Sequence, residues 1–143
     1  MIYLDTSLVV ALCAHERDSD KVEAALATVE EPLCTSEWTR VEFTSAVAIK
    51  FRNRELSEAL ARRALADYYL AFEPGVTIII PSRDDYIRAA DYLQDFKRGL
   101  RGGDALHIAI AVNSVARVTR VLTLDKGFIR SARGMAVPVE LPW

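Results

Sequence analysis

The chain has 143 residues, of which 51% are hydrophobic and 27% are charged, and its formal net charge is −2. This composition is that of a globular protein and excludes a disordered or collagen-like chain. The length predicts a single domain, residues 1–143, with room for a sizeable core. Because the net charge is slightly negative, any contact with nucleic acid requires a local basic patch.

Two cysteines, Cys13 and Cys34, lie among apolar residues. They have neither the spacing of a zinc site nor the number needed for a disulfide framework, so we expect buried free thiols in a reducing cytoplasm. No apolar run reaches the roughly 18 residues that a membrane span needs. The N-terminus also lacks a charged segment before an apolar stretch, so we expect a cytoplasmic protein without a membrane partner.

Strand-like and helix-like segments alternate along the chain. Apolar or β-branched runs predict five strands, at residues 2–4, 32–35, 76–80, 118–124 and 137–139. Apolar residues at helical spacing predict helices at residues 6–12, 20–29, 37–52, 57–69, 84–96, 104–116 and 128–132. This alternation predicts an α/β fold with a mainly parallel sheet.

Local signals add detail to several of these elements. The β-branched run at 76–80 predicts a strand covered on both faces. The helix at 104–116 is almost wholly apolar, which predicts a buried helix. Polar residues at helix starts predict caps at Ser19 or Asp20 and at Ser36, and helix starts at Ser57 and at Asp84 or Asp85. The face of the helix at 37–52 that is expected to lie inward carries Trp38, Val41, Ser45, Ala48 and Ile49.

Four acidic residues occupy positions that need an explanation. Asp5 and Asp125 each follow an apolar strand, where a structural turn residue is the alternative. Asp104 opens the most apolar helix, where an ordinary N-cap is the alternative. Glu42 lies inside a helix with no basic residue three or four positions away, so a buried carboxylate there has no local charge compensation.

Considered together, these four acids predict a site. The carboxyl ends of parallel strands share one edge of a sheet, and a helix start or a neighbouring helix can reach that edge. Converging carboxylates would repel and raise each other's pKa, a conflict that a divalent cation removes. Oxygen ligands suit Mg²⁺ or Mn²⁺, and such an ion can activate water and stabilise a phosphate oxygen. The acids therefore predict phosphodiester hydrolysis.

Four segments, in this order, resemble the PIN-domain ribonucleases, and in order and spacing the VapC-type toxins of toxin–antitoxin pairs. They are residues 3–7 (YLDTS), 37–43 (EWTRVEF), 104–109 (DALHIA) and 122–125 (LTLD). The resemblance implies a PIN-like three-layer α/β/α sandwich and an endoribonuclease that depends on Mg²⁺ or Mn²⁺. It maps the family's acidic cluster onto Asp5, Glu42, Asp104 and Asp125.

The resemblance also implies roles and partners. Asp5, Asp104 and Asp125 would be direct or water-mediated metal ligands, and Glu42 would bind the metal or position the attacking water. Hydroxyl positions that accompany the cluster match Thr6 and Thr123. A VapB-type antitoxin would block the site with a C-terminal segment, and the toxin would form homodimers and toxin–antitoxin hetero-oligomers. The approach to the DALHIA segment, RGG, is looser than in many family members.

Two histidines are further candidates for a chemical role. His107 lies three residues after Asp104 and shares its helical face, so it predicts either a general base or a residue that supports the site structurally. His15 lies in a polar loop and is expected to be solvated. A ribonuclease based on histidine would work without metal, so sensitivity to a chelator separates that mechanism from the metal-dependent one.

The basic residues before the site helix are candidates for phosphate contacts. Lys97, Arg98 and Arg101 could lie along the path of an RNA, with a solvated charged surface as the alternative. The helices at 37–52 and 57–69 could also leave an apolar groove for an antitoxin segment or a second copy of the chain.

Two other functions stay open from the sequence. One is a non-catalytic PIN-like module that binds RNA or protein, and the other is a different metal-dependent phosphohydrolase or a DNA nuclease on the same acids. The RNA target, the number of metal ions, the antitoxin and the oligomer size do not follow from the residues.

Overall fold

The computed structural model describes residues 1–14, 16–115 and 117–143, so the expectation for His15 and the predicted helix end at Ala116 concern residues outside the described part. The centre is a sheet in which every hydrogen-bonded strand pair is parallel. The strands are β1 (Ile2–Leu4), β2 (Leu33–Ser36), β3 (Thr77–Ile79), β4 (Arg120–Leu122) and β5 (Val139–Glu140). Their order across the sheet is β3-β2-β1-β4-β5.

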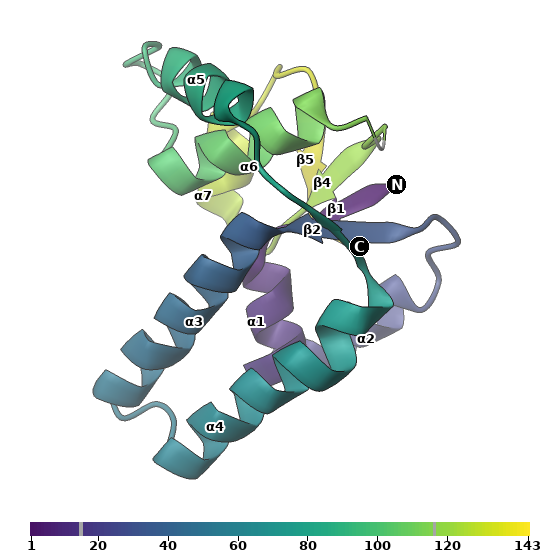
Figure 1. The fold of residues 1–143 in the computed structure, drawn as a ribbon, viewed down its shortest axis with the longest axis vertical. Coiled ribbons are helices and arrows are strands. Elements are labelled where there is room, and N and C mark those ends of the chain that lie inside the picture. Colours follow the sequence, from purple (N-terminus) through teal and green to yellow (C-terminus); the bar gives the residue numbers. More distant parts are fainter. Residues whose placement is uncertain (15, 116) are drawn as a thin grey trace.

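Helices cover both faces of this sheet. They are α1 (Thr6–Ala14), α2 (Ser19–Leu26), α3 (Glu37–Arg52), α4 (Glu58–Asp67), α5 (Arg83–Tyr92), α6 (Gly102–Asn113) and α7 (Lys126–Ser131). Residues of α1 to α4 pack into one core cluster and residues of α5 to α7 into the other, and Figure 1 shows the two groups on opposite sides of the sheet. The predicted α/β/α sandwich with a parallel sheet is confirmed.

The first strand shows how the sequence forms these layers. Successive side chains of a strand point to opposite faces. Ile2 and Leu4 accordingly belong to the core cluster under α1 and α3, whereas Tyr3 belongs to the cluster under α6. All three side chains are fully buried. β1 therefore fixes helices on both sides and holds Asp5 rigidly at its carboxyl end.

The prediction that residues 76–80 form a strand covered on both faces is wrong. β3 is an edge strand that pairs only with β2. Thr77 is exposed and Ile80, just after the strand, is 78% exposed. A β-branched run gives strand character, but the place of the strand in the sheet depends on pairing with distant segments.

The predicted inward face of α3 is also wrong. The residues it buries are Thr39, Phe43 and Val47, at spacings of four, and they face α1 and α4. Val41 is 58% exposed and Ile49 is 45% exposed. Both sides of this helix carry apolar residues, so local periodicity did not decide which side would find a partner.

The helix caps follow the sequence in part. Ser57, the predicted start of a helix, is the N-cap of α4 and accepts a hydrogen bond from the Leu60 amide. The N-cap of α5 is Ser82, with Asp85 completing a capping box, so the helix begins at Arg83, before the predicted start at Asp84 or Asp85. The N-cap of α2 is Asp18, so the prediction of Ser19 or Asp20 as its cap is wrong.

The buried helix and the free thiols are confirmed. The residues from Ala105 to Ala111 of α6 are all buried. That helix begins at Gly102 with Arg101 at its N-cap, so Asp104 lies in its first turn and is not its cap. Cys13 and Cys34 are buried and free. Within the described residues, every helix is too short or too polar to cross a membrane.

The strand order places a topological switch beside β1. From β1 the chain moves to β2 and β3 on one side, then returns to β4 and β5 on the other side. Open parallel sheets bind ligands outside the carboxyl ends of the strands at such a switch point. Asp5 follows β1 and Asp125 lies shortly after β4, so both acids stand at this crevice.

Candidate functional site

A cleft of about 360 Å³ opens at the switch point. All four predicted acids line it: Asp5, Glu42, Asp104 and Asp125, together with Thr6, Ser7, Arg101 and Gly103. The structure thus brings together four acids that are separated by up to 120 residues in the chain. Their convergence follows from the parallel sheet, and their part in catalysis stays a prediction.

Asp5 is the most firmly held of the four acids. It is buried, and its Oδ2 accepts hydrogen bonds from the Ser7 hydroxyl at 2.7 Å, the Thr123 hydroxyl at 2.7 Å and the Ser7 amide at 3.2 Å. Thr123 also accepts a hydrogen bond from the Asp125 amide at 3.0 Å. The predicted supporting residue Thr123 therefore links two of the acids, and Asp5 Oδ1 lies 3.3 Å from His107 Nε2.

Glu42 reaches the cleft from the third helix and meets His107. Its Oε2 lies 2.7 Å from His107 Nε2 and accepts a hydrogen bond from the Thr6 hydroxyl at 2.5 Å. Burial alone raises the pKa of Glu42, but the hydrogen bonds from His107 and Thr6 outweigh it, so the pKa lies below its ordinary value. Glu42 is therefore ionised at neutral pH.

His107 is 1% exposed and lies between two carboxylates. Its Nε2 is 3.3 Å from Asp5 Oδ1 as well as 2.7 Å from Glu42 Oε2. Burial lowers the pKa of His107, whereas Glu42, Asp5 and Asp104 raise it more strongly, so its pKa lies above the ordinary value. His107, predicted as a possible supporting residue, is thus the basic group beside Asp5 and Glu42.

Two residues behind His107 were missed from the sequence. The Tyr3 hydroxyl lies 2.7 Å from His107 Nδ1 and 2.7 Å from the Ser36 hydroxyl. Ser36 stands at the N-cap position of α3 but makes no side-chain bond to that helix. The available signal was a polar tip on an otherwise apolar strand, since a buried tyrosine hydroxyl generally has a partner.

Arg101 holds the other half of the cluster. It donates to Asp104 through Nε at 2.9 Å and through a terminal nitrogen at 3.3 Å, and the same terminal nitrogen donates to Asp125. Among the described residues that line the cleft, Arg101 is the one basic side chain that carries a permanent charge. These contacts hold the pKa of Arg101 above its ordinary value, first through Asp104 and then through Asp125.

The two acids bound by Arg101 differ in their electrostatics. Burial raises the pKa of Asp104, and despite Arg101 the charges of Asp5 and Asp125 leave it above its ordinary value. Asp125 is less buried than Asp104. Burial raises its pKa, but the hydrogen bonds from Arg101 and from the amides of Phe128 and Gly127 lower it by more, so the pKa of Asp125 lies below its ordinary value. Its Oδ1 accepts from these amides at 3.1 and 2.6 Å, so Asp125 also caps α7.

Gly103 leaves room for the Glu42 side chain at the start of α6. A Cβ atom at this position would overlap Glu42 Oε1, whereas a Cβ atom at Gly102 would meet nothing within 4 Å. The structure therefore explains one of the two glycines before Asp104. At Gly103 a side chain would occupy the space that the Glu42 carboxylate fills.

The donor set fits a divalent cation. Asp5 and Glu42 each offer a carboxylate oxygen, and these oxygens and a ring nitrogen of His107 lie within 4.8 Å of one another. The four carboxylates outnumber the one permanent cation in the cleft, and one of them, Asp104, has a pKa that its acidic neighbours raise. A hard cation with carboxylate ligands, such as Mg²⁺ or Mn²⁺, would relieve that excess of negative charge.

A second cleft of about 380 Å³ adjoins the first and shares Arg101 and Asp104 with it. Arg98 and Arg130 also line this cleft. Arg98 donates to the carbonyls of Ser131 and Arg133 and pairs with Asp95. Arg130 was missed from the sequence, although its place five residues after Asp125 on a helix that Asp125 caps was a usable signal.

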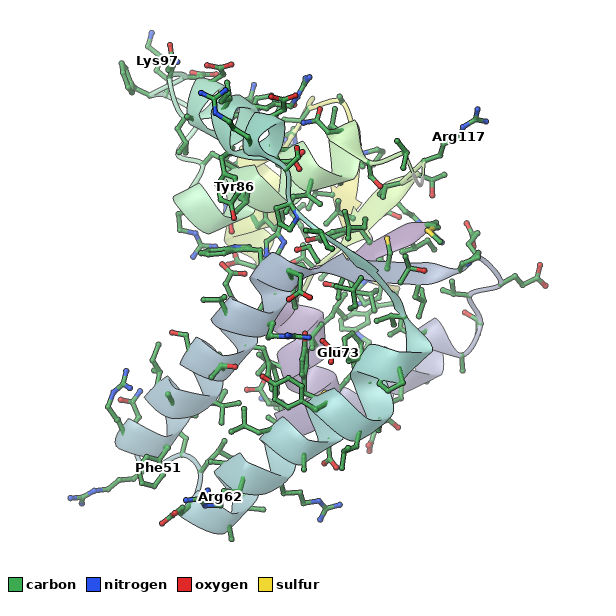
Figure 2. All side chains as sticks on the ribbon, viewed as in Figure 1. Phe51, Arg62, Glu73, Tyr86, Lys97 and Arg117 are labelled. Atoms are coloured by element: carbon green, nitrogen blue, oxygen red, sulfur yellow. The ribbon has the colours of Figure 1, made fainter. Side chains whose placement is uncertain are left out.

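Lys97 is not among the residues that line either cleft. Figure 2 shows its side chain pointing out from the end of the molecule beyond α5. Of the three basic residues predicted to contact RNA, the structure therefore brings Arg101 into the acidic cleft and Arg98 beside it, and it leaves Lys97 apart.

The sequence model of the PIN domain family matches residues 2–134 of this chain. Fold and sequence therefore agree, and the chain belongs to the PIN domain family. A comparison with curated proteins finds no significant match.

Several solved structures share this fold. VapC20 of Mycobacterium tuberculosis, described as a Sarcin-Ricin loop cleaving toxin, matches with a TM-score of 0.70 and 21% identity, covering 94% of this chain and 95% of that chain. FitAcB of Neisseria gonorrhoeae gives a TM-score of 0.70 and 20% identity over 100% and 99% of the two chains. VapBC2 of Rickettsia felis, bound to a DNA fragment from their promoter, gives 0.64 and 17% over 99% and 98%. At these identities the likeness establishes the fold.

Proposed function

We propose that this protein is a divalent-metal-dependent endoribonuclease and the VapC-type toxin of a toxin–antitoxin pair. One observation carries the proposal: Asp5, Glu42, Asp104 and Asp125 line a single cleft at the switch point of a PIN-domain sheet. Acids without matched bases are costly to bring together, and a metal-dependent phosphodiesterase has a use for them. A binding module that never cleaves RNA has no such use.

Different side chains of the cleft would bind the metal, orient the attacking water and bind the substrate phosphate. Asp5, Asp104 and Asp125, with Glu42, would hold Mg²⁺ or Mn²⁺, and the bound ion supplies a more acidic water and neutralises charge on a phosphate oxygen. Glu42 is ionised at neutral pH and faces the cleft, so it can accept a hydrogen bond from the attacking water and orient it. Arg101 is the permanent cation at the cleft and can donate to a substrate phosphate.

The second cleft supplies a path for the RNA backbone. Arg101 lines both clefts, and Arg98 and Arg130 line the second one. Guanidinium groups bind phosphate through paired hydrogen bonds. A strand that passes from the second cleft to the first would place one phosphodiester at the acids and its neighbours beside arginines, whatever its sequence. Lys97 lines neither cleft and stays a weaker candidate for RNA contact.

The proposed partner is a VapB-type antitoxin. VapBC2 and FitAcB share this fold, and a structure described as a toxin–antitoxin complex from Klebsiella pneumoniae matches with a TM-score of 0.63 at 20% identity over 100% of this chain and 98% of that chain. An apolar groove of about 440 Å³ between α3 and α4 is lined by Val47, Phe51, Ala61 and Leu65 among others. We expect an antitoxin segment there, and a homodimer that assembles with antitoxin into a hetero-oligomer.

The test is RNA cleavage with Mg²⁺, with Mn²⁺ and with a chelator, comparing wild type with Asp5→Asn. We expect metal-dependent cleavage by wild type and a loss of about a thousandfold or more in the variant, which corresponds to about 4 kcal/mol of transition-state stabilisation. Asp84→Asn, an exposed aspartate on α5, is the matched control and should cleave normally.

Three outcomes would contradict this function. Cleavage that survives the chelator would indicate histidine chemistry, and cleavage of DNA in preference to RNA would indicate a DNA nuclease. A wild-type protein that binds RNA without cleaving it under any metal would indicate the non-catalytic module.

A further inference from the structure

The His107 ring is held at both nitrogens by buried groups. Nδ1 lies 2.7 Å from the Tyr3 hydroxyl, and Nε2 lies 2.7 Å from Glu42 Oε2. Tyr3 and His107 also contact each other edge to face, with ring centroids 5.5 Å apart. The imidazole therefore has one fixed orientation between β1 and the cleft.

The partners decide where the ring proton lies. A carboxylate can only accept hydrogen bonds, and Nε2 faces two of them, Glu42 at 2.7 Å and Asp5 at 3.3 Å. Nε2 is therefore protonated and donates. Because a nitrogen that carries this proton has no free lone pair, the same atom is not available to ligate a metal ion.

The other side of the ring is fixed by a short polar chain. The Tyr3 hydroxyl lies 2.7 Å from both His107 Nδ1 and the Ser36 hydroxyl. Tyr3 and Ser36 are both fully buried, one on β1 and the other at the end of β2. Ser36 gives up the usual bond of an N-cap side chain to its helix, and its hydroxyl serves Tyr3 instead.

We propose that His107 is a positioning residue that holds Glu42 beside Asp5, and that Tyr3 and Ser36 fix the ring in the orientation this requires. The inference rests on the proposed function for its effect on cleavage, but its effect on metal binding is independent of RNA. Groups behind metal ligands orient those ligands, and their loss typically weakens metal affinity or activity 10–100-fold.

The first experiment removes a single hydroxyl group. Tyr3→Phe keeps the ring that fills the core, and Mn²⁺ binding is measured by calorimetry without RNA. We expect the Kd for Mn²⁺ to rise about tenfold and kcat for RNA to fall about tenfold, with KM little changed because the groups that bind RNA stay in place. Tyr86→Phe, an exposed tyrosine on α5, is the matched control and should match wild type. An unchanged Kd in Tyr3→Phe overturns the proposal.

The second experiment separates the two ring nitrogens. In His107→Gln the side-chain amide reaches the position of Nε2 and can still donate to Glu42, whereas in His107→Asn it reaches only the position of Nδ1. We expect the Gln variant to bind Mn²⁺ at least about tenfold more tightly than the Asn variant. Equal affinities, or a tighter Asn variant, would overturn the proposal. If neither variant folds by circular dichroism, Tyr3→Phe decides alone.

The third experiment tests the rival role of His107 as a metal ligand. Electron spin echo spectroscopy of the Mn²⁺-loaded wild type detects coupling to a directly bound ¹⁴N nucleus. We expect no such coupling, and its presence would make His107 a ligand and overturn the proposal. A protein that binds Mn²⁺ but cleaves no RNA would end the proposed function while these measurements still decide the role of His107; a protein that binds no Mn²⁺ would end both.

Discussion

The acidic cluster has two halves that are compensated in different ways. Asp5 and Glu42 meet the imidazole of His107, which is 1% exposed and fixed from behind by Tyr3. Asp104 and Asp125 meet the guanidinium of Arg101, whose side chain is 64% exposed and reaches in from the N-cap of α6. One basic group is part of the core, and the other lies on the surface.

This difference means that His107 stays fixed beside its acids, whereas Arg101 can be replaced at its acids by a metal ion. Moving His107, which lies on α6, would disturb β1 and α3, because its partners Tyr3 and Glu42 lie on those elements. It would also disturb β2, because Ser36 bonds to the same Tyr3 hydroxyl. Arg101 can leave its acids by side-chain rotation alone, since solvent already surrounds most of it. We therefore expect the His107 half to define the geometry of the site and the Arg101 half to respond to metal and RNA.

The largest expected effect concerns Asp104, the acid of the cluster whose pKa is raised. Asp104→Asn should abolish metal-dependent cleavage yet raise the melting temperature of the metal-free protein by a few degrees. The pKa of Asp104 is raised, so at neutral pH its charged form lies at a cost to the fold that a neutral amide avoids. Thermal unfolding in chelator measures this. A lower melting temperature than that of the Asp84→Asn control would contradict it.

A smaller effect is expected at Gly103, which adjoins Asp104 in the chain and lies against Glu42. In Gly103→Ala the added methyl group pushes the flexible end of Glu42 away, so cleavage should fall about tenfold, a loss of about 1.4 kcal/mol at the transition state, while the fold keeps its stability. Gly102→Ala is the neighbouring control, since its methyl group meets nothing. Equal activity in the two variants would show that the position of Glu42 does not matter.

The exchangeable half is tested by Arg101→Gln. Removing the cation frees Asp104 and Asp125, so Mn²⁺ should bind several-fold more tightly, while RNA should bind several-fold more weakly. The slope of log affinity for RNA against log salt should fall in magnitude by about 0.7, as expected when the protein neutralises one phosphate fewer on a single strand. Arg83→Gln on α5 is the matched control. Weaker Mn²⁺ binding in Arg101→Gln would contradict the picture of competing cations.

The sequence predicted the acids of the site but not the groups behind His107. Asp5 and Asp125 were expected at one edge because parallel strands bring their carboxyl ends together, and that reasoning needs only the strand pattern. The partners of His107 were not predicted, because Tyr3 has the pattern of an ordinary strand residue and Ser36 that of an ordinary cap. Their connection depends on how β1, β2 and α6 stack, and no local pattern encodes it.

Packing between distant elements also explains the errors in the predicted fold. Val41 and Ile49 were expected inside, yet Phe43 and Val47 are the buried residues, because α1 and α4 happen to cover that side of α3. The run at 76–80 has strand character, but only long-range pairing made it an edge strand. Local signals thus predicted which elements form, and the packing between distant elements decided which side each of them buries.

The smallest expected effect is a pH dependence that belongs to the buried half alone. The folded pKa of His107 is raised above its ordinary value of 6.5, so its contribution to stability is fully present below pH 6.5 and is lost as pH rises through the folded pKa. The lowered pKa of Glu42 acts in the opposite direction: its contribution is present above pH 4.5 and is lost as pH falls through its folded pKa. In chelator, the melting temperature of wild type should therefore fall more steeply above pH 6.5 than that of His107→Gln, which has no proton to lose. Parallel curves for the two proteins would mean that His107 stays neutral throughout and supports Glu42 by geometry without charge.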